Sequence, residues 1–355
     1  MPTSQATQTG TYDISTLLAA RNQSAAAFGL ETIQRILAAD LAAHNFIVGQ
    51  MLTGLVEMTT DRQRLYGASV GGSMVEVDEY GRSPTQVAAP GSTVGFPLRN
   101  FQYAIGWTKK YMDNATPSDL AIAQQAAQKS HLLVIEREIK RAIYVSTDYT
   151  FTDFLVDKIA LPIKRFANAD GQAIPMGPNG ETYDATTHTH YTAVAALPAA
   201  ALTAVINNTI EHGFGGQVVV AINKADEAAV RALTGFVAYP DPRIIFRNTD
   251  TPGQTLDISR LDNRAIGIFA GAEVQVKPWA LANYAFAWDS ASPQKPLAFR
   301  QRASTTVTDL QIAAELDTYP LYAKYFEAEF GVGVWTRTNG AVLEFDSAAY
   351  NQPVI

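Results

Sequence analysis

Two histidines separated by a single residue, His188 and His190, are the side chains with the clearest capacity for chemistry in this chain. On a strand, residues two apart lie on the same face, so both imidazoles could bind one metal ion. Asp184 or His212 could supply a further ligand, but neither stands at a spacing that is characteristic of a metal site. The pattern therefore favours a polar loop or an interface pair, and we predict no metal ligand here.

A second motif, NKAD at residues 223–226, follows an apolar run and matches the guanine-recognition element of small GTPases. The phosphate-binding sequence GxxxxGK[ST] does not occur in the chain, so a strand end followed by a helix cap is the better interpretation. The glycines at residues 213–216 precede a strand rather than a helix, which is the wrong context for phosphate binding. No GxSxG motif occurs, and ERE at residues 136–138 is interpreted as a solvated or intersubunit helix face. We therefore predict no catalytic residue, no cofactor and no enzymatic activity.

The composition indicates a substantial core and little surface charge. The chain has 355 residues, of which 47% are hydrophobic and 17% charged, and its formal net charge is -7. The acidic balance argues against a dedicated nucleic-acid-binding protein, which needs clustered Lys and Arg. The absence of cysteine excludes disulfides, thiolate metal sites and cysteine nucleophiles. We expect no transmembrane helix, because no apolar run is long enough, and no secretory signal at the start of the sequence.

The segment at residues 61–100 has a composition that cannot build its own core. It contains six glycines and three prolines, and its alternating run at residues 75–78 ends at a turn at Tyr80-Gly81. This pattern predicts a polar two-stranded ribbon, which is only marginally stable in water when isolated. Because the segment lies in the middle of the chain, we expect it to lie against a neighbouring copy of the protein. The predicted intersubunit contacts are Met74, Val75, Val77, Tyr80, Arg82 and Val87.

The periodicity before and after this segment predicts helices and strands. Residues 1–28 are rich in Ser, Thr, Gln and Ala and are expected to form a mobile or partner-docked arm. Residues 30–58 carry apolar side chains at helical spacing and predict a helix that breaks near Gly49. Apolar residues alternate at 94–98 and, in shifted phase, at 101–107, and the shift predicts a β-bulge between the two runs.

The clearest helix signal begins at Thr116, which can cap a helix, followed by Pro117 and Asp119 in the first turn. No glycine or proline interrupts the pattern up to Tyr144. It therefore predicts a spine helix of roughly 28 residues, about 42 Å long. Residues 145–197 are expected to form loops and short strands.

From residue 198 onward the pattern predicts a compact lobe of helices and strands and then a strand-rich end. The predicted helices are residues 197–211, closed by Gly213, and residues 225–233. Asn339-Gly340 followed by an apolar run is a strong hairpin signal. The predicted strands are residues 217–222, 244–246, 266–269, 273–276, 284–288, 296–302 and 325–345.

The order of these sections resembles one family, the major capsid proteins of tailed bacteriophages with the Hong Kong 97 capsid fold. Three short segments are similar as well: HTHY at 188–191, EHG at 211–213 and FGVGVWTRTNGAVL at 330–343. The resemblance implies an α+β fold with an N-terminal arm, an extended loop, a peripheral domain with a spine helix and an axial domain. The implied boundaries are 1–58 for the arm and its helix, 59–108 for the extended loop, 109–197 for the peripheral domain with the spine helix, 198–300 for the axial domain and 301–355 for the returning peripheral strands.

The resemblance implies a structural protein that self-assembles, as hexamers and pentamers, into the icosahedral head shell of a tailed bacteriophage enclosing double-stranded DNA. The implied partners are further copies of the chain, separate scaffolding, portal and decoration proteins, and packaged DNA contacted non-specifically, with no membrane. The expected location is the virion, after assembly in the host cytoplasm. The alternatives are an encapsulin-like nanocompartment shell, which shares the fold, and a soluble αβ enzyme that uses His188 and His190.

Two further expectations concern how such a shell is built and held together. The arm at residues 1–28 is shorter than the scaffolding domain that some relatives carry, so a separate scaffold is expected unless a longer precursor is trimmed. Some members of the family form an isopeptide bond between a lysine on the extended loop and an asparagine of a neighbour. Asn339 could be the acceptor, but no lysine precedes Lys109, which lies beyond the base of the loop. We therefore predict no isopeptide cross-link.

Overall fold

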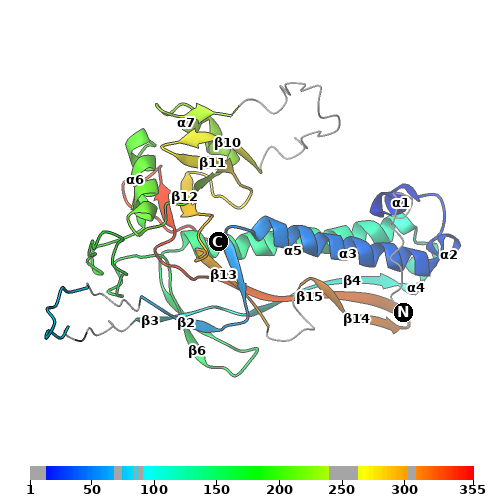
Figure 1. The fold of residues 1–355 in the computed structure, drawn as a ribbon. Coiled ribbons are helices and arrows are strands. Elements are labelled where there is room, and N and C mark those ends of the chain that lie inside the picture. Colours follow the sequence, from blue (N-terminus) through cyan, green and yellow to red (C-terminus); the bar gives the residue numbers. More distant parts are fainter. Residues whose placement is uncertain (1–12, 68–73, 84, 86–90, 240–262, 303–308) are drawn as a thin grey trace. The chain divides into compact units, whose positions relative to one another are not determined.

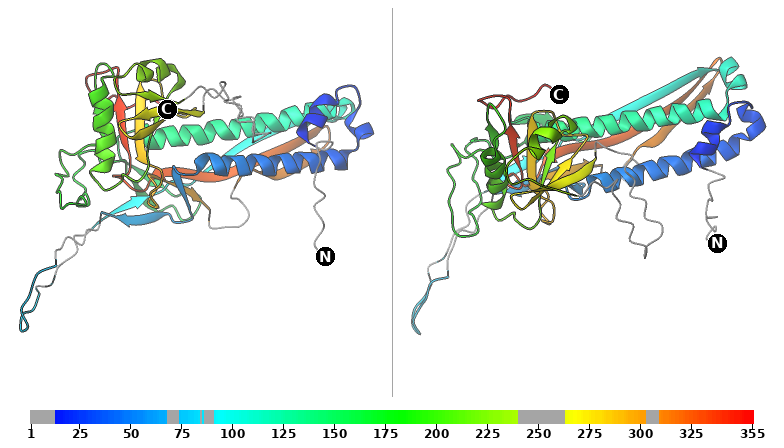
Figure 2. Two further views of the ribbon diagram at one scale, coloured as in Figure 1. Left: turned by 45° about the horizontal axis from the view of Figure 1, so that its top comes forward. Right: turned by 90° about the horizontal axis from the view of Figure 1, so that it is seen from above.

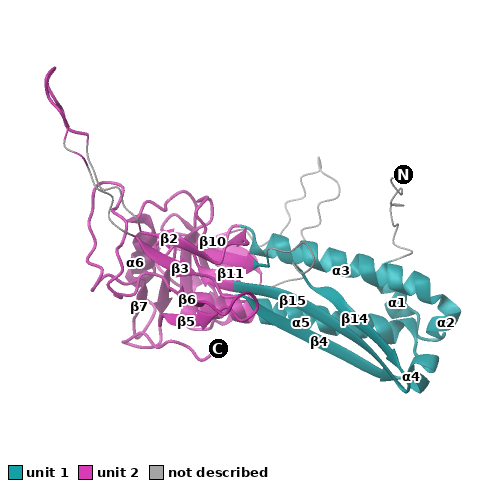
Figure 3. Ribbon diagram, turned by 90° about the horizontal axis from the view of Figure 1, so that it is seen from below, with its two compact units in different colours: residues 1–53, 98–135, 301–331 teal, residues 54–97, 136–300, 332–355 magenta. Residues whose placement is uncertain are grey.

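The computed structural model describes residues 13–67, 74–83, 85, 91–239, 263–302 and 309–355 as a mixture of helices and strands (Figure 1). They belong to two compact units (Figure 3). The predicted strand at residues 244–246 lies outside the described part of the chain. The first unit comprises Met1–Thr53, Leu98–Ile135 and Gln301–Gly331, and the second comprises Gly54–Pro97, Glu136–Arg300 and Val332–Ile355.

The first unit begins with two short helices that pack against a long one. Helix α1 (Ile14–Ala19) is capped by the side chain of Asp13, and α2 (Ala25–Phe28) by that of Ser24. Leu17 and Ala25 join a buried cluster with apolar residues of α3 (Leu30–Leu52). Of the two alternatives, a mobile or a partner-docked arm, the first is wrong for residues 13–28, because they contribute to the core of their own unit; docking on a partner stays a prediction. Residues 1–12 lie outside the described part of the chain.

Helix α3 continues through Gly49, where a break was predicted. A glycine inside a helix costs only about 1 kcal/mol relative to alanine, and the helix buries apolar side chains on both sides of it. The helix ends at Leu52, and the next residues turn at Gly54 (φ +84) and form β1 (Val56–Thr59), so the predicted helical end at residue 58 is also wrong. The buried residues of α3 are Ile33, Ile36, Leu37, Leu41, His44, Val48 and Leu52.

Helix α5 (Pro117–Tyr144) confirms the predicted spine helix. Thr116 and Asp119 form a reciprocal cap at its start. Thr116 Oγ1 accepts from the Asp119 amide at 3.3 Å, and Asp119 Oδ2 accepts from the Thr116 amide at 3.0 Å. The buried positions recur every three or four residues, as expected for a helix with one covered face. They include Ala121, Gln124, Ala127, His131, Ile135, Glu138, Ile139, Ala142 and Ile143.

The antiparallel strands of the first unit are β4 (Arg99–Thr108), β14 (Gln311–Thr318) and most of β15 (Leu321–Val334), whose residues from Val332 onward belong to the second unit. Strand β15 pairs with β14 on one side and along the whole of β4 on the other. Helix α3 and the first part of α5 lie side by side over this sheet (Figures 1 and 2). The side chain of Gln124 on α5 donates to the Leu37 carbonyl of α3 at 2.6 Å. The short helix α4 (Lys109–Asn114) follows β4.

The second unit is built on a seven-stranded mixed sheet with the order β7-β16-β12-β8-β11-β10-β9. Strand β8 (Val218–Ile222) is buried along its whole length and confirms the predicted core strand. It pairs parallel with β11 (Ala272–Val276) and antiparallel with β12 (Tyr284–Asp289). Helix α6 (Ala199–Ile210) packs its apolar side chains into the same core. The remaining strands are β7 (Tyr191–Ala193), β9 (Val237–Ala238), β10 (Arg264–Phe269) and β16 (Ala341–Glu344).

Three short pairings stand beside this sheet in the second unit. Strand β1 pairs parallel with β13 (Leu297–Gln301), and β13 in turn neighbours β15 in a five-stranded sheet. Strands β2 (Gln63–Tyr66) and β3 (Ser92–Gly95) are antiparallel, as are β5 (Tyr149–Thr152) and β6 (Ala160–Ile163). The β2–β3 pair lies at the two ends of the glycine-rich segment and closes it into a loop.

Two local predictions are wrong because each assumed that two consecutive strands belong to the same sheet, whereas the chain changes its partner strand between them. The phase shift at residues 99–100 is not a β-bulge, since β3 pairs with β2 whereas β4 pairs with β15. The Asn339-Gly340 turn does not close a hairpin. Strand β15 pairs with β13, β14 and β4, whereas β16 pairs with β12 and β7. Alternation reports which side chains share a face, but it does not report the partner strand.

The helical turns after β8 are held by one carboxylate. Residues Lys224–Asp226 form the 3-10 turn η2, and Glu227–Arg231 form α7. Glu227 makes ion pairs of 2.5, 2.9 and 2.7 Å with Lys224, Arg231 and Arg264. Burial alone would raise the pKa of Glu227, but the hydrogen bonds from these three cations outweigh it and lower the pKa from 4.5 to about 2.

We expect Glu227→Gln to destabilise the protein at pH 7 but not below about pH 2. The folded-state pKa is lower than the unfolded value, so the contribution of Glu227 is complete above pH 4.5 and is lost as the pH falls towards about 2. Urea unfolding across this range should show a difference between wild type and variant that closes at low pH. Glu79→Gln, which changes an exposed carboxylate, is the control. A difference for Glu227→Gln that does not depend on pH would contradict this role.

Candidate functional site

The base of the glycine-rich segment is a two-stranded ribbon fixed to the second unit. Strands β2 and β3 pair antiparallel over their whole length. Tyr66, Val94 and Phe96 from this base are buried in one apolar cluster. The Tyr66 hydroxyl also forms a hydrogen bond of 2.7 Å with the hydroxyl of Thr338. The predicted ribbon is therefore present at the base of the loop.

Beyond this base, the described residues 74–83 are exposed and form neither helix nor strand. The predicted turn is present, because the Gly81 amide donates to the Asp78 carbonyl at 3.0 Å. The predicted strand pairing of residues 75–78 is not, so within the described residues the ribbon is confined to β2 and β3. Arg82 is exposed, and Val87 lies outside the described part of the chain.

Four of the predicted contact residues leave large apolar side chains in water. Met74 and Tyr80 are 104% and 90% exposed, and Val75 and Val77 are each 48% exposed. Exposed apolar side chains that cluster on one segment typically mark an interaction surface. Contact of this segment with a neighbouring subunit stays a prediction.

A second candidate site brings together His188, His190, Glu211 and His212. The Nε2 atom of His188 lies 3.0 Å from that of His190 and 3.0 Å from that of His212, and the last two are 3.1 Å apart. The ring centres are 5.0–5.1 Å apart. Since the nitrogens are closer together than the ring centres, the three rings direct Nε2 towards one common point. Glu211 Oε1 lies 3.6 Å from Nε2 of both His188 and His212.

The tautomer of His190 follows from its other ring nitrogen. His190 Nδ1 lies 2.7 Å from the carbonyl oxygen of Gly340, which can only accept, so Nδ1 carries the hydrogen. The neutral ring then presents a lone pair at Nε2. Burial lowers the pKa of His188, His190 and His212, that of His212 to about 4, so the imidazoles are neutral at pH 7.

The backbone around His188 and His190 is fixed by a short ladder with residues 167–169. The Ala169 amide donates to the His188 carbonyl at 2.9 Å, and the His190 amide donates to the Ala167 carbonyl at 2.7 Å. Between these bonds Asn168 and Thr189 form an isolated antiparallel bridge. The two histidines therefore leave the ladder on the same side, as residues two apart on a strand do.

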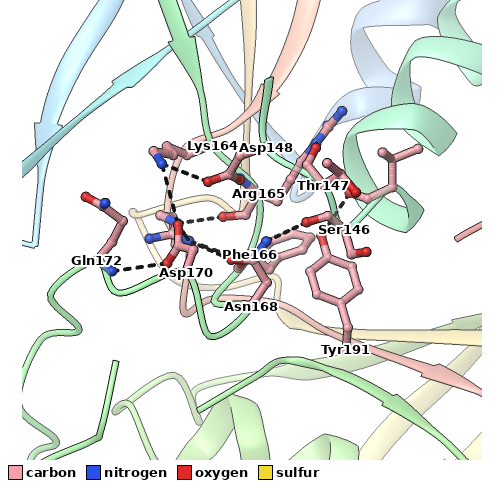
Figure 4. A network of polar contacts seen from close by, with 12 residues as sticks. Ser146, Thr147, Asp148, Lys164, Arg165, Phe166, Asn168, Asp170, Gln172 and Tyr191 are labelled. Atoms are coloured by element: carbon pink, nitrogen blue, oxygen red, sulfur yellow. Dashed lines mark hydrogen bonds and ion pairs between the residues drawn. The ribbon is translucent and has the colours of Figure 1, made fainter. Parts of the chain in front are cut away.

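The ladder is itself anchored by a network of ion pairs, shown in Figure 4. Lys164 Nζ lies 2.8 Å from Asp148 and 3.6 Å from Asp170. The buried guanidinium of Arg337 pairs with Asp170 at 2.8 Å and donates to the Arg165 carbonyl at 2.6 Å. This network holds residues 164–170 in place and with them the segment that carries the histidines.

Glu211 and His212 are positioned by the end of helix α6. Gly213 has a φ of +85, a conformation that favours glycine, and its amide donates to the Ile210 carbonyl at 2.8 Å. The predicted closing glycine is confirmed. The Tyr183 hydroxyl donates to the Glu211 carbonyl at 2.7 Å, and the Tyr183 ring centre lies 4.3 Å from that of His212.

Sequence reasoning identified the three histidines as metal-ligand candidates but missed Glu211. Asp184, the other candidate, is exposed, and its Oδ1 accepts from the amide and hydroxyl of Thr186 at 2.8 and 2.7 Å. It is not a member of the group. The sequence signals for Glu211 are its place beside His212 at the end of a predicted helix and the EHG segment at residues 211–213. Spacing along the chain cannot show that this helix end meets the His188 segment.

The remaining motifs have structural roles. Asn223 Oδ1 accepts from the Ala225 amide at 2.9 Å, which confirms a strand end followed by a helix cap. Glu138 is buried and pairs with Arg141 at 3.1 Å, so the predicted solvated or intersubunit face is wrong for this residue.

Among the described residues, no helix has both the length and the apolar character needed to cross a membrane.

Asn339, the conceivable cross-link acceptor, is buried and engaged within its own unit. Its side-chain Nδ2 donates to the carbonyls of Gln294 and Asp289 at 2.7 and 3.3 Å, and its Oδ1 accepts from the Asp289 amide at 2.8 Å. An amide with an exposed fraction of 0% that makes three hydrogen bonds cannot be reached by a lysine of another subunit. The structure therefore argues against the acceptor, as the sequence argues against the donor.

Comparison with known proteins identifies the fold. No protein-family model and no curated protein sequence matches the chain. A solved chain from Mycobacterium phage Patience is similar over 99% of this chain and 97% of its own length, with a TM-score of 0.67 and 19% identity. The predicted α+β Hong Kong 97-type capsid fold is confirmed.

Two other similar structures have lower TM-scores. The capsid of a native GTA particle has a TM-score of 0.48 and 15% identity, covering 84% of this chain and 89% of the other. The holo-SrpI encapsulin complex from Synechococcus elongatus PCC 7942 has a TM-score of 0.44 and 9% identity, covering 85% and 89%.

Proposed function

We propose that this chain is the major capsid protein of a tailed bacteriophage and self-assembles into an icosahedral head shell around double-stranded DNA. The observation that carries the proposal is the fold, which the chain shares over nearly its whole length with a chain from Mycobacterium phage Patience. The role is structural rather than enzymatic. Copies of the chain form the hexamers and pentamers of the shell, with separate scaffolding, portal and decoration proteins, and assembly takes place in the host cytoplasm.

The loop at residues 74–83 exposes apolar side chains that a neighbouring subunit would cover. Met74, Val75, Val77 and Tyr80 lose their contact with water only if another surface covers them. In a closed ring each subunit offers the same loop to the next one, so one patch repeats until the ring closes. We therefore assign residues 59–108 as the extended loop, with residues 198–300 as the axial domain around the ring centre.

The net charge of the chain is consistent with weak contact between the shell and packaged DNA, a contact that does not depend on the DNA sequence. The formal net charge is -7, and phosphate binding requires clustered cations. A mildly acidic shell would repel DNA weakly rather than bind it. The DNA could then be packed tightly without adhering to the wall.

The size of the purified assembly separates this function from a soluble enzyme. Gel filtration followed by negative-stain electron microscopy of the full chain, expressed with and without a scaffolding protein from the same source, should show shells or capsomer-sized rings. A monomer or small oligomer under all of these conditions would contradict the proposal and favour an enzyme.

Mature shells should contain no covalent link between subunits. Boiled in detergent, they are expected to run on a gel as a single band near 38.4 kDa. The reason is that no lysine occurs before Lys109 and that the Asn339 side chain is buried. A ladder of bands at multiples of the subunit mass would contradict this expectation.

A further inference from the structure

The converging imidazoles and the Glu211 carboxylate form a site that the proposed shell function does not use. We propose that His188, His190, Glu211 and His212 bind one Zn²⁺ ion that holds this part of the second unit together. Three imidazole nitrogens and one carboxylate oxygen are donors that zinc takes in proteins, in four-coordinate tetrahedral geometry. This proposal is independent of whether the protein forms a shell.

The spacing of the donor atoms fits a tetrahedral ion. With metal–ligand bonds of about 2.0–2.2 Å, neighbouring ligand atoms lie about 3.3–3.6 Å apart. Here the three nitrogen–nitrogen distances are 3.0–3.1 Å and two nitrogen–oxygen distances are 3.6 Å. All four donor atoms lie within 4.8 Å of one another. Shifts of a few tenths of an ångström, together with a small rotation of the partly exposed Glu211, would complete the coordination.

The hydrogen atoms of the three rings cannot be arranged favourably without a cation. In a neutral ring each Nε2 is either a donor or an acceptor. When three such atoms are in mutual contact, at least one pair must bring two lone pairs or two hydrogens together at 3.0–3.1 Å. A cation at the common point resolves this conflict, because all three Nε2 atoms then direct lone pairs at it.

Two further observations point to the same ion. Glu211 Oε1 is buried and accepts no hydrogen bond within the described part of the chain, and such an atom requires a compensating partner. His190 donates through Nδ1 to the Gly340 carbonyl. Zinc-binding histidines commonly donate their second nitrogen to a carbonyl in this way, which fixes the tautomer and the ring orientation.

The ion would join segments that are far apart in the sequence. His188 and His190 come from the segment directly before β7, Glu211 and His212 come from the end of α6, and Gly340 precedes β16. Four protein ligands leave no open position for a substrate, which is the arrangement of a structural rather than a catalytic zinc site.

Metal titration of the full-length protein tests the site directly. Protein stripped with a chelator and titrated with Zn²⁺ alone should bind one ion per chain, and its thermal midpoint should rise on binding. Co²⁺ in place of Zn²⁺ should give the intense visible absorption of tetrahedral coordination. The absence of stoichiometric Zn²⁺ binding by correctly folded wild-type protein would overturn the proposal.

Substitutions locate the bound ion. His188→Ala removes the most exposed of the three imidazoles and should weaken Zn²⁺ binding by at least about 100-fold. His188→Cys supplies another zinc ligand and should retain part of the affinity for Zn²⁺. His44→Gln is the matched control, because His44 contacts His131 in the first unit and belongs to no group of metal ligands in the described chain. If His188→Ala does not fold, the Zn²⁺ affinity of Glu211→Gln, which preserves the size of the side chain, tests the same assignment. Wild-type affinity in both His188→Ala and Glu211→Gln would mean adventitious binding elsewhere and would overturn the assignment.

Discussion

Deletion of residues 74–88 is expected to leave a folded, soluble subunit that no longer closes into a shell. The described residues 74–83 are all exposed and form no helix or strand, so their removal exposes no core. The loop base, in contrast, is anchored through Tyr66, Val94 and Phe96 and would remain. Circular dichroism and thermal unfolding of the variant should match those of the wild type, while electron microscopy should show no closed particles.

A length-preserving variant separates the loss of the loop from the loss of its apolar contacts. This variant carries four substitutions, Met74→Ser, Val75→Ser, Val77→Ser and Tyr80→Ser, and keeps the chain length. It should also prevent shell closure if burial of apolar side chains drives the contact between subunits. Glu79→Gln, in the same exposed segment, should assemble as the wild type does. If the deletion variant unfolds as an isolated subunit, the loop belongs to the core of its own chain and its assignment is wrong.

Asp153→Ala is expected to destabilise the second unit by about 3–5 kcal/mol, because it leaves a buried cation without its partner. Arg300 donates to Asp153 Oδ2 at 2.7 Å and to the Phe96 carbonyl at 2.8 Å. The exposed fractions of the two side chains are only 4% and 0%. Since Phe96 follows β3, this pair ties β13 to the base of the extended loop.

The double variant Asp153→Leu with Arg300→Met provides the control. Replacing both members of a buried ion pair by apolar groups removes the unpaired charge and should recover much of the lost stability. Urea unfolding of the single and double variants measures the difference. If Asp153→Ala lowered the stability by less than about 1 kcal/mol, the pair would be solvated and would not anchor the loop base.

Local signals in the sequence were sufficient for elements whose ends are set by neighbouring residues. Helix α5 has the predicted bounds because Thr116 and Asp119 cap it and no glycine or proline follows before Tyr144. Strand β8 was predicted because it is apolar throughout. Strand β14 was missed because nearly all of its residues are exposed, so no apolar alternation marks it.

The errors arose where distant segments decide the structure. The phase shift before β4 marks a change of partner from β2 to β15, and the Asn339 turn leads from one sheet to another because its side chain bonds to Asp289 at the end of β12. The histidine cluster has the same origin. The spacing of His188 and His190 is visible in the sequence, whereas Glu211 and His212 join them only because α6 ends beside them.

A cryo-electron microscopy reconstruction of particles assembled from the full chain would show both the shell and the position of the loop at residues 74–82. We expect a closed icosahedral shell in which residues 74–82 of each subunit lie on the surface of a neighbouring subunit, with Met74, Val75, Val77 and Tyr80 covered. A shell in which this loop remains in solvent would contradict the assignment of the contact. A chain that forms only small oligomers, with or without its scaffolding partner, would contradict the capsid function itself.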